Sequence, residues 1–135
     1  SPLAEKRGIT LFQPAEPDIT IYGSDILIYQ VVFNLTENAV RYNRENGSVT
    51  ITAAKRGKDA VITVSDTGPG ISEEFRESVF EPFFRVDKSR SRSLGGVGLG
   101  LALVHEITTL HGGTVQITES SENGTVFEIC LPLAE

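Results

Sequence analysis

A run of four glycines within six residues leads directly into an apolar stretch and could bind an anion. The run is Gly95-Gly96-Val97-Gly98-Leu99-Gly100, and the stretch is Leu101-Ala102-Leu103-Val104. Glycines let a backbone approach a ligand closely or adopt positive φ. If the apolar stretch is a helix, its free N–H groups and the positive end of its dipole face whatever lies over the glycines, as in phosphate sites. Glycines also form ordinary turns, so both interpretations stay open.

The segment before this run, residues 85–94, is basic and rich in serine. It holds four of the twelve Lys and Arg residues of the chain. The glycine spacing matches neither the P-loop nor the Rossmann fingerprint, and no strand-like run precedes it. We therefore expect either a solvated surface loop or a lid whose arginines can swing toward phosphates.

Polar side chains that could hold a phosphate or a metal ion recur along a predicted helix, residues 25–42. Asn34, Asn38, Arg41 and Tyr42 recur at intervals of four and three, which places them on one face. A carboxamide oxygen can coordinate Mg²⁺ without adding negative charge beside phosphates, and Arg41 could reach the same phosphates. A solvated helix face is the alternative. The core stripe of the same helix is Ile28, Val31, Val32, Leu35 and Ala39.

An acidic residue followed by two glycines comes directly after the apolar run 61–64. The motif is Asp66-Thr67-Gly68-Pro69-Gly70-Ile71. At the end of a strand, the Asp66 carboxylate could accept a hydrogen bond from an amino group while the glycines let a flat ring approach. An Asx turn explains the same residues without a ligand.

The predicted elements must bring these groups together. Alternating apolar residues predict strands at 9–12, 19–22, 49–53, 60–64, 114–118 and 125–131. Ser24 or Asp25 can cap the helix 25–42, Ser72 opens a short helix, and a further helix covers about 99–111. Turns are expected at 56–59 and 121–124. We expect an α+β fold, a two-layer sandwich in which helices cover one face of a mixed, mostly antiparallel sheet.

Composition narrows the classes of protein. The chain has 135 residues, enough for one domain, and its net charge of −6 argues against nucleic acid as a partner. Cys130 is the single cysteine, expected as a buried structural thiol in a reducing compartment. No stretch approaches the about 20 apolar residues of a membrane span, and no signal peptide is visible. The chain begins at Ser1 without an initiator Met, so we expect a piece of a longer protein.

Five motifs in a fixed order are more specific than any one of them. They are Asn34-x-x-x-Asn38, Asp66-x-Gly-x-Gly, Phe80-Glu81-Pro82-Phe83-Phe84-Arg85, Gly96-x-Gly-x-Gly and Gly124-Thr125-x-Phe127. This order resembles the N, G1, F, G2 and G3 boxes of the catalytic ATP-binding domain of sensor histidine kinases, over essentially residues 1–135. Gyrase, the Hsp90 chaperones and the MutL proteins share that ATP-binding fold but lack the Phe-Glu-Pro-Phe-Phe-Arg box.

The resemblance implies a nucleotide site with Mg²⁺ as cofactor and ATP as substrate. It implies that Asn38 ligates Mg²⁺, that Arg41 and Arg85 contact phosphates, and that Asp66 binds the adenine amino group. The other implied nucleotide contacts are Asn34, Tyr42, Gly68, Gly70, Ile71, Gly96, Val97, Gly98, Leu99, Gly100 and Thr125. Val97 stands where threonine is frequent, and the glycine spacing is intact.

The resemblance also implies transfer of the ATP γ-phosphoryl group to a histidine on a separate dimerisation domain. That domain is absent here, so the chain alone should not autophosphorylate. Catalysis would rest on Mg²⁺, Asn38, Arg41 and Arg85, and a role for Glu37 stays open. His105 and His111 follow the glycine run on an apolar helix or at its end, so we expect them to be structural. The ATP lid would cover about residues 80–98.

The partners implied are ATP, the dimerisation domain and, through the whole kinase, a response regulator. We expect no contact with a membrane or with nucleic acid, and a cytoplasmic location, in a parent that in many relatives is membrane-anchored. Two alternatives remain: a serine/threonine kinase of the same fold, as in anti-sigma factors, and a module that only senses ATP or docks a partner.

Overall fold

The structure is a computed structural model that describes residues 2–12, 19–82 and 100–134. Its helices are α1 (Pro2–Arg7), α2 (Asp25–Arg41) and α4 (Gly100–Leu110), with short 3₁₀ turns η1 (Glu73–Phe75) and η2 (Ser78–Phe80). Its strands are β1 (Thr10–Phe12), β2 (Ser48–Arg56), β3 (Asp59–Asp66), β4 (Thr114–Ser121) and β5 (Gly124–Pro132). No helix in these ranges is long and apolar enough to cross a membrane.

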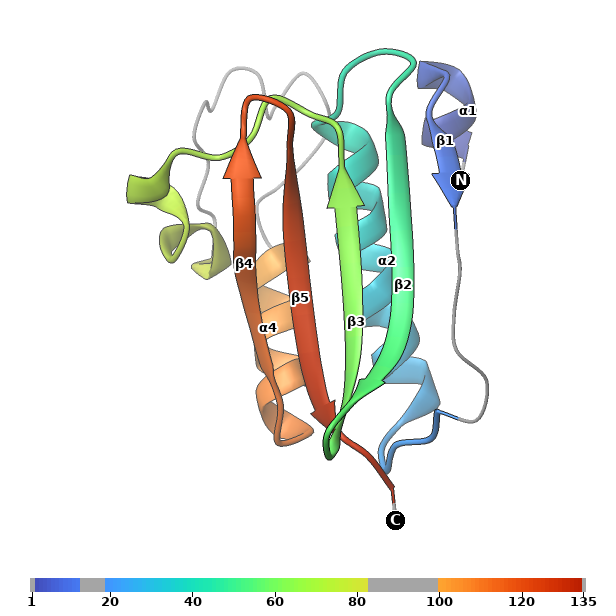
Figure 1. Cartoon of the computed structure of the whole chain (residues 1–135), viewed down its shortest axis with the longest axis vertical. Coiled ribbons are helices and arrows are strands. Elements are labelled where there is room, and N and C mark those ends of the chain that lie inside the picture. Colours follow the sequence, from blue (N-terminus) through green and yellow to red (C-terminus); the bar gives the residue numbers. More distant parts are fainter. Residues whose placement is uncertain (1, 13–18, 83–99, 135) are drawn as a thin grey trace.

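The strands form one sheet in the order β1-β2-β3-β5-β4. The short β1 runs parallel to β2, and every other neighbouring pair is antiparallel. In Figure 1, α2 and α4 lie side by side behind the same face of this sheet. The predicted two-layer α+β sandwich with a mixed, mostly antiparallel sheet is therefore confirmed.

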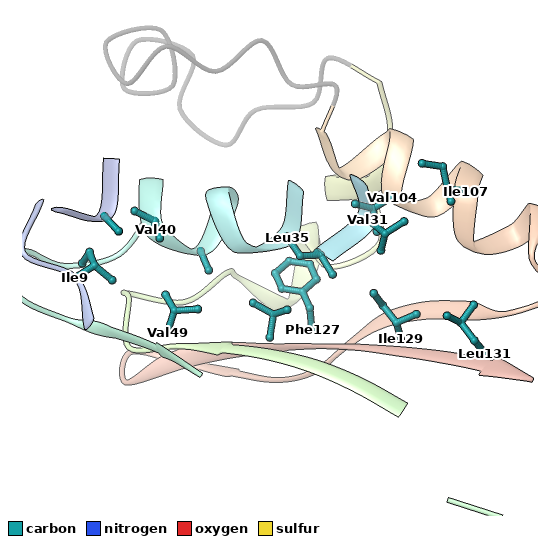
Figure 2. Close-up of a cluster of buried hydrophobic side chains, with 13 residues drawn as sticks. Ile9, Val31, Leu35, Val40, Val49, Val104, Ile107, Phe127, Ile129 and Leu131 are labelled. Atoms are coloured by element: carbon teal, nitrogen blue, oxygen red, sulfur yellow. The ribbon is translucent and has the colours of Figure 1, made fainter. Parts of the chain in front are cut away.

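Alternation along the strands creates the core between sheet and helices. In β5, Phe127, Ile129 and Leu131 are buried while the residues between them are partly exposed, because successive side chains point to opposite faces. Figure 2 shows these three side chains pointing toward Val31 and Leu35 of α2 and Val104 of α4. The layers are thus joined by apolar contacts in which branched side chains predominate.

The long helix α2 begins and ends close to its predicted bounds. The hydroxyl of Ser24 accepts a hydrogen bond from the Leu27 N–H at 3.2 Å and caps the helix. Of the predicted core stripe, Val31, Leu35 and Ala39 are buried, whereas Ile28 and Val32 are only partly so. Val40, which was not predicted, joins the core because it faces the sheet near β2.

Two predictions about the fold are wrong. The predicted strand at 19–22 forms only an isolated bridge between Ile21 and Leu133, because no further backbone pairing extends it within the described residues. Cys130 is partly exposed rather than buried. Its neighbours along β5 point into the core, so its thiol lies on the opposite face of the sheet, near Arg56 and Glu128.

Candidate nucleotide-binding site

Asp66 ends the central strand β3 and is fixed by backbone donors. Its Oδ1 atom accepts hydrogen bonds from the Gly68 N–H at 2.9 Å and from the Thr125 N–H at 3.2 Å. The bond from Gly68 makes the Asx turn that the sequence suggested. No group within the described ranges donates to Oδ2. The Asx turn and the ligand-binding interpretation are therefore compatible, since each uses a different carboxylate oxygen.

Burial of Asp66 changes its proton affinity. Loss of hydration raises the pKa of the Asp66 carboxyl above its ordinary range, and the N–H bonds from Gly68 and Thr125 pull this pKa down again to a smaller extent. A partly buried carboxylate of this kind is stabilised by one more donor. An amino group placed at Oδ2 would supply that donor, so the site is suited to a ligand that carries an exposed N–H.

Glycine is required beside Asp66 for reasons of space. A Cβ at Gly68 would lie 2.9 Å from the Tyr42 carbonyl oxygen and 3.2 Å from Asp66 Oδ1. At Gly124, φ is +143° and a Cβ would collide with the backbone carbonyl of Asp66. The two glycines let the loop after β3 lie directly against the end of α2 and the β4–β5 hairpin.

The polar stripe of α2 faces the beginning of α4. The Asn34 amide oxygen accepts a hydrogen bond from Gln30 Nε2 at 2.7 Å, and its Nδ2 lies 3.5 Å from the Gly100 carbonyl oxygen. Gly100 is the first residue of α4, so the predicted helix does follow the glycine run directly. The N-terminal end of α4, where backbone N–H groups lack intrahelical acceptors, therefore lies close to Asn34.

Asn38 differs from Asn34 in that its amide makes no hydrogen bond to any described residue. Asn38 is only partly exposed, and so is Glu37 beside it. An available amide oxygen on a helix is a suitable hard ligand for Mg²⁺. Asn34 already uses its oxygen, which makes Asn38 the better metal ligand of the two. Arg41 is the last residue of the same helix and Tyr42 is its C-cap, and both are partly buried.

Several predicted site residues lie outside the described residues. These are Arg85, Gly96, Val97, Gly98 and Leu99, together with most of the expected lid. The described part brings together Asp66, Gly68, Gly70, Ile71 and Thr125 at one end of the sheet. It places Asn34 and Gly100 at the contact between α2 and α4.

Ser120 joins three segments of the site and was not predicted. Its Oγ accepts a hydrogen bond from the Ile71 N–H at 2.7 Å and lies 2.8 Å from Thr125 Oγ1. Its carbonyl oxygen accepts from Arg76 Nη2 at 3.0 Å. A polar hollow of about 370 Å³ opens at this end of the hairpin. Its lining residues are Ser65, Asp66, Arg76, Glu119, Ser120, Ser121, Asn123, Gly124, Thr125 and Val126. The sequence could have pointed to Ser120 only through the predicted hairpin, which places it opposite Thr125.

The two histidines lie on α4 or at its end, as predicted, and contact structural partners. His111 Nδ1 lies 2.9 Å from the Ile107 carbonyl oxygen, and its Nε2 accepts from the Ser24 N–H at 3.1 Å. His111 thus joins the end of α4 to the first turn of α2. The exposed His105 packs near Phe80, with ring centroids 6.1 Å apart.

Sequence comparison names the family to which this two-layer α/β sandwich belongs. Residues 23–135 match the family described as histidine kinase-, DNA gyrase B-, and HSP90-like ATPase. The match covers more than half of the chain, so this chain belongs to that ATPase family.

Curated relatives are sensor kinases. The sensor histidine kinase RppB of Synechocystis sp. is 40% identical over 86% of this chain and 26% of its own length. The sensor-like histidine kinase SenX3 of Mycolicibacterium smegmatis is 36% identical over 96% of this chain and 34% of its own length. The chain thus spans about a quarter to a third of these relatives.

Solved structures show the same fold. Full-length ShkA in complex with AMPPNP superimposes with a TM-score of 0.86 at 32% identity, covering 99% of this chain and 27% of ShkA. The histidine kinase ThkA in complex with the response regulator protein TrrA gives 0.78 at 30% identity, covering 97% of this chain and 36% of ThkA.

Proposed function

We propose that this chain binds ATP and transfers its γ-phosphoryl group to a histidine on a separate helical dimerisation domain, as the catalytic domain of a sensor histidine kinase. The observation that carries the proposal is Asp66, with Oδ1 held by two backbone N–H groups and Oδ2 left for a ligand amino group. Its position at the end of β3, in the order of motifs found in the sensor kinases, supports adenine as that ligand.

The proposed roles divide the site into two ends. The adenine is held by Asp66, Gly68, Gly70, Ile71, Tyr42 and Thr125. Tyr42 lies against the ring, and the N–H of Thr125 fixes the Asp66 carboxylate. Asn34, Arg41 and the N-terminal end of α4 lie at the phosphate end, where N–H groups and positive charge favour phosphates. We propose that Arg85, Gly96, Gly98 and Gly100 contact phosphates and that residues 80–98 serve as the lid; of these, 83–99 lie outside the described residues.

Mg²⁺ is proposed to lie against Asn38, whose amide oxygen is available. No group of three or more His, Cys, Asp or Glu side chains that could hold a metal occurs in the described part of the chain. Phosphate oxygens and water would supply the remaining ligands, as is usual for Mg²⁺. When bound, the ion neutralises phosphate charge. Asn38 then orients the phosphates, and Arg41 stabilises the charge that develops during transfer.

Calorimetry with this chain tests nucleotide binding. We expect ATP to bind, and more tightly with Mg²⁺ than with EDTA. Absence of binding under both conditions would contradict the proposal. The phosphoacceptor is tested by mixing the chain with a dimerisation domain of a homologous kinase and ATP labelled at the γ-phosphate. Acid-labile, base-stable label on histidine is expected, whereas acid-stable phosphoserine would indicate a serine kinase of the same fold.

The wider setting is part of the same proposal. The whole protein would pass its phosphoryl group to a response regulator, consistent with the likeness to ThkA in its complex with TrrA. The domain would act in the cytoplasm, where ATP is available. A pull-down of the whole kinase with candidate response regulators, followed by transfer of labelled phosphate, tests this step.

A further inference from the structure

Arg7, the last residue of α1, holds the end of α2. Its Nη1 donates to the carbonyl oxygens of Val40, at 3.1 Å, and of Arg41, while its Nη2 donates to the Asn43 carbonyl oxygen at 2.5 Å. Its Nε lies 3.4 Å from Glu45, whose side chain is largely exposed. One guanidinium therefore contacts three carbonyls around the C-terminus of the helix.

This contact fits the chemistry of a helix end. The last carbonyls of a helix lack intrahelical partners and carry partial negative charge, which a cation stabilises. The planar guanidinium offers several N–H donors in a fixed fork. The Arg7 side chain is only 13% exposed, so the contact is largely shielded from water. Arg7 thereby ties α1, which precedes the matched family region 23–135, to the helix that carries Asn38 and Arg41.

A network of hydrogen bonds continues from Arg7 to the adenine end of the site. Asn43 is 1% exposed, and its Oδ1 accepts from Thr67 Oγ1 at 3.0 Å while its Nδ2 donates to the Ser48 carbonyl oxygen at 2.9 Å. Thr67 Oγ1 in turn accepts from the Ser48 N–H at 2.9 Å. Thr67 directly follows Asp66, so covalent structure completes the path from Arg7 through Asn43 to the carboxylate.

We infer that Arg7 and Thr67 are positioning residues that make nucleotide affinity depend on how α1 is seated against the end of α2. Loss of the Arg7 contact releases the Asn43 backbone and loosens the Thr67 hydroxyl that Asn43 holds. Asp66 then meets the nucleotide in a less defined orientation. A segment that moves α1 would in this way change ATP binding without touching the nucleotide. This inference rests on the proposed role of Asp66.

The test compares nucleotide affinity in matched variants of this chain. Thr67→Val removes the hydroxyl and keeps the side-chain shape, whereas Thr67→Ser keeps the hydroxyl; because Thr67 is exposed, both should fold. Arg7→Met keeps an apolar stem without donors, and Arg7→Lys restores a positive donor. Arg56→Met is the control, since Arg56 pairs with Glu128 on the other face of the sheet. ADP affinity is measured by calorimetry, well below the unfolding temperature of each variant.

We expect Thr67→Val and Arg7→Met to bind ADP roughly 5- to 10-fold more weakly, in line with the loss of one hydrogen bond. Thr67→Ser and Arg56→Met should stay within about twofold of wild type, and Arg7→Lys should fall between Arg7→Met and wild type, because an ammonium group lacks the planar fork that contacts three carbonyls. The ¹⁵N–¹H resonance of Gly68, which donates to Asp66, should shift in both weakened variants. Unchanged ADP affinity in folded Thr67→Val overturns the inference, even if Arg7→Met does not fold. Failure of the wild-type chain to bind ADP contradicts the proposed function instead.

Discussion

The substitution Asp66→Asn isolates one oxygen of the proposed adenine contact. The amide keeps an oxygen that can accept the N–H groups of Gly68 and Thr125, so the loop after β3 can retain its geometry. The NH₂ group takes the place of Oδ2 and presents a donor where the adenine amino group also donates. The variant should therefore fold and lose nucleotide affinity.

The size of the loss follows from the charge of the lost acceptor. A hydrogen bond to a charged group contributes about 1.5–3 kcal/mol. Since about 1.4 kcal/mol corresponds to a tenfold change, ATP should bind roughly 10- to 150-fold more weakly. The free energy of unfolding should not fall in parallel, because the neutral amide avoids the cost of burying a charge, the same cost that raises the pKa of Asp66.

Isothermal calorimetry with ATP and inosine triphosphate provides the assay. Inosine carries a carbonyl where adenine carries its amino group, so the amide of the variant can donate to it. We expect the ratio of ATP to inosine triphosphate affinity to fall in Asp66→Asn and to stay unchanged in Asp59→Asn, a control at the other end of β3. An unchanged ratio in Asp66→Asn would refute the assignment of Oδ2 to adenine.

Three further predictions concern the metal, pH and the helix contact. Asn38→Ala should abolish most of the gain in ATP affinity that Mg²⁺ provides, measured by calorimetry with Mg²⁺ and with EDTA. If the variant kept the whole Mg²⁺-dependent gain in affinity, Asn38 would not be a metal ligand. Because the folded-state pKa of Asp66 is raised, its ionisation lowers folding stability as pH rises through that pKa. In urea unfolding, the free energy of unfolding of Asp66→Asn should therefore rise relative to that of wild type as pH rises. A difference in unfolding free energy that stays constant with pH would contradict the raised pKa. His111→Ala leaves the Ser24 N–H without its acceptor and should lower the free energy of unfolding by about 1–3 kcal/mol. A variant as stable as wild type would contradict a structural role for this contact.

Periodicity predicted the elements whose side chains alternate or recur strongly. The helix 25–42 and the four longer strands were recognised because apolar residues in them fall on one face, which the structure buries in β5 and in α2 and only partly covers in β4. The six-residue α1 was not predicted, because so short a helix depends on tertiary contacts such as those of Arg7. The strand predicted at 19–22 does not form, because an alternating sequence also needs a partner strand, and here the backbone makes only one bridge, between Ile21 and Leu133.

The site was predicted as a set of residue types, and its connections were not. The Asn34 and Asp66 motifs stand out by composition and order. The bonds through Asn43, Thr67 and Ser120 join residues far apart in the chain, and nothing in their local sequence names the partner. Such polar networks arise from tertiary packing, so only coordinates reveal them.

The position of Cys130 provides an optical probe of nucleotide occupancy. It is the single cysteine of the chain, partly exposed on the sheet face opposite the helices. Its register partner is Val61, five residues before Asp66 along β3. At about 3.3 Å per residue, the label and the proposed adenine contact are roughly 16 Å apart. A maleimide dye on Cys130 would therefore lie within energy-transfer range of a fluorescent nucleotide, and binding could be followed without introducing any mutation.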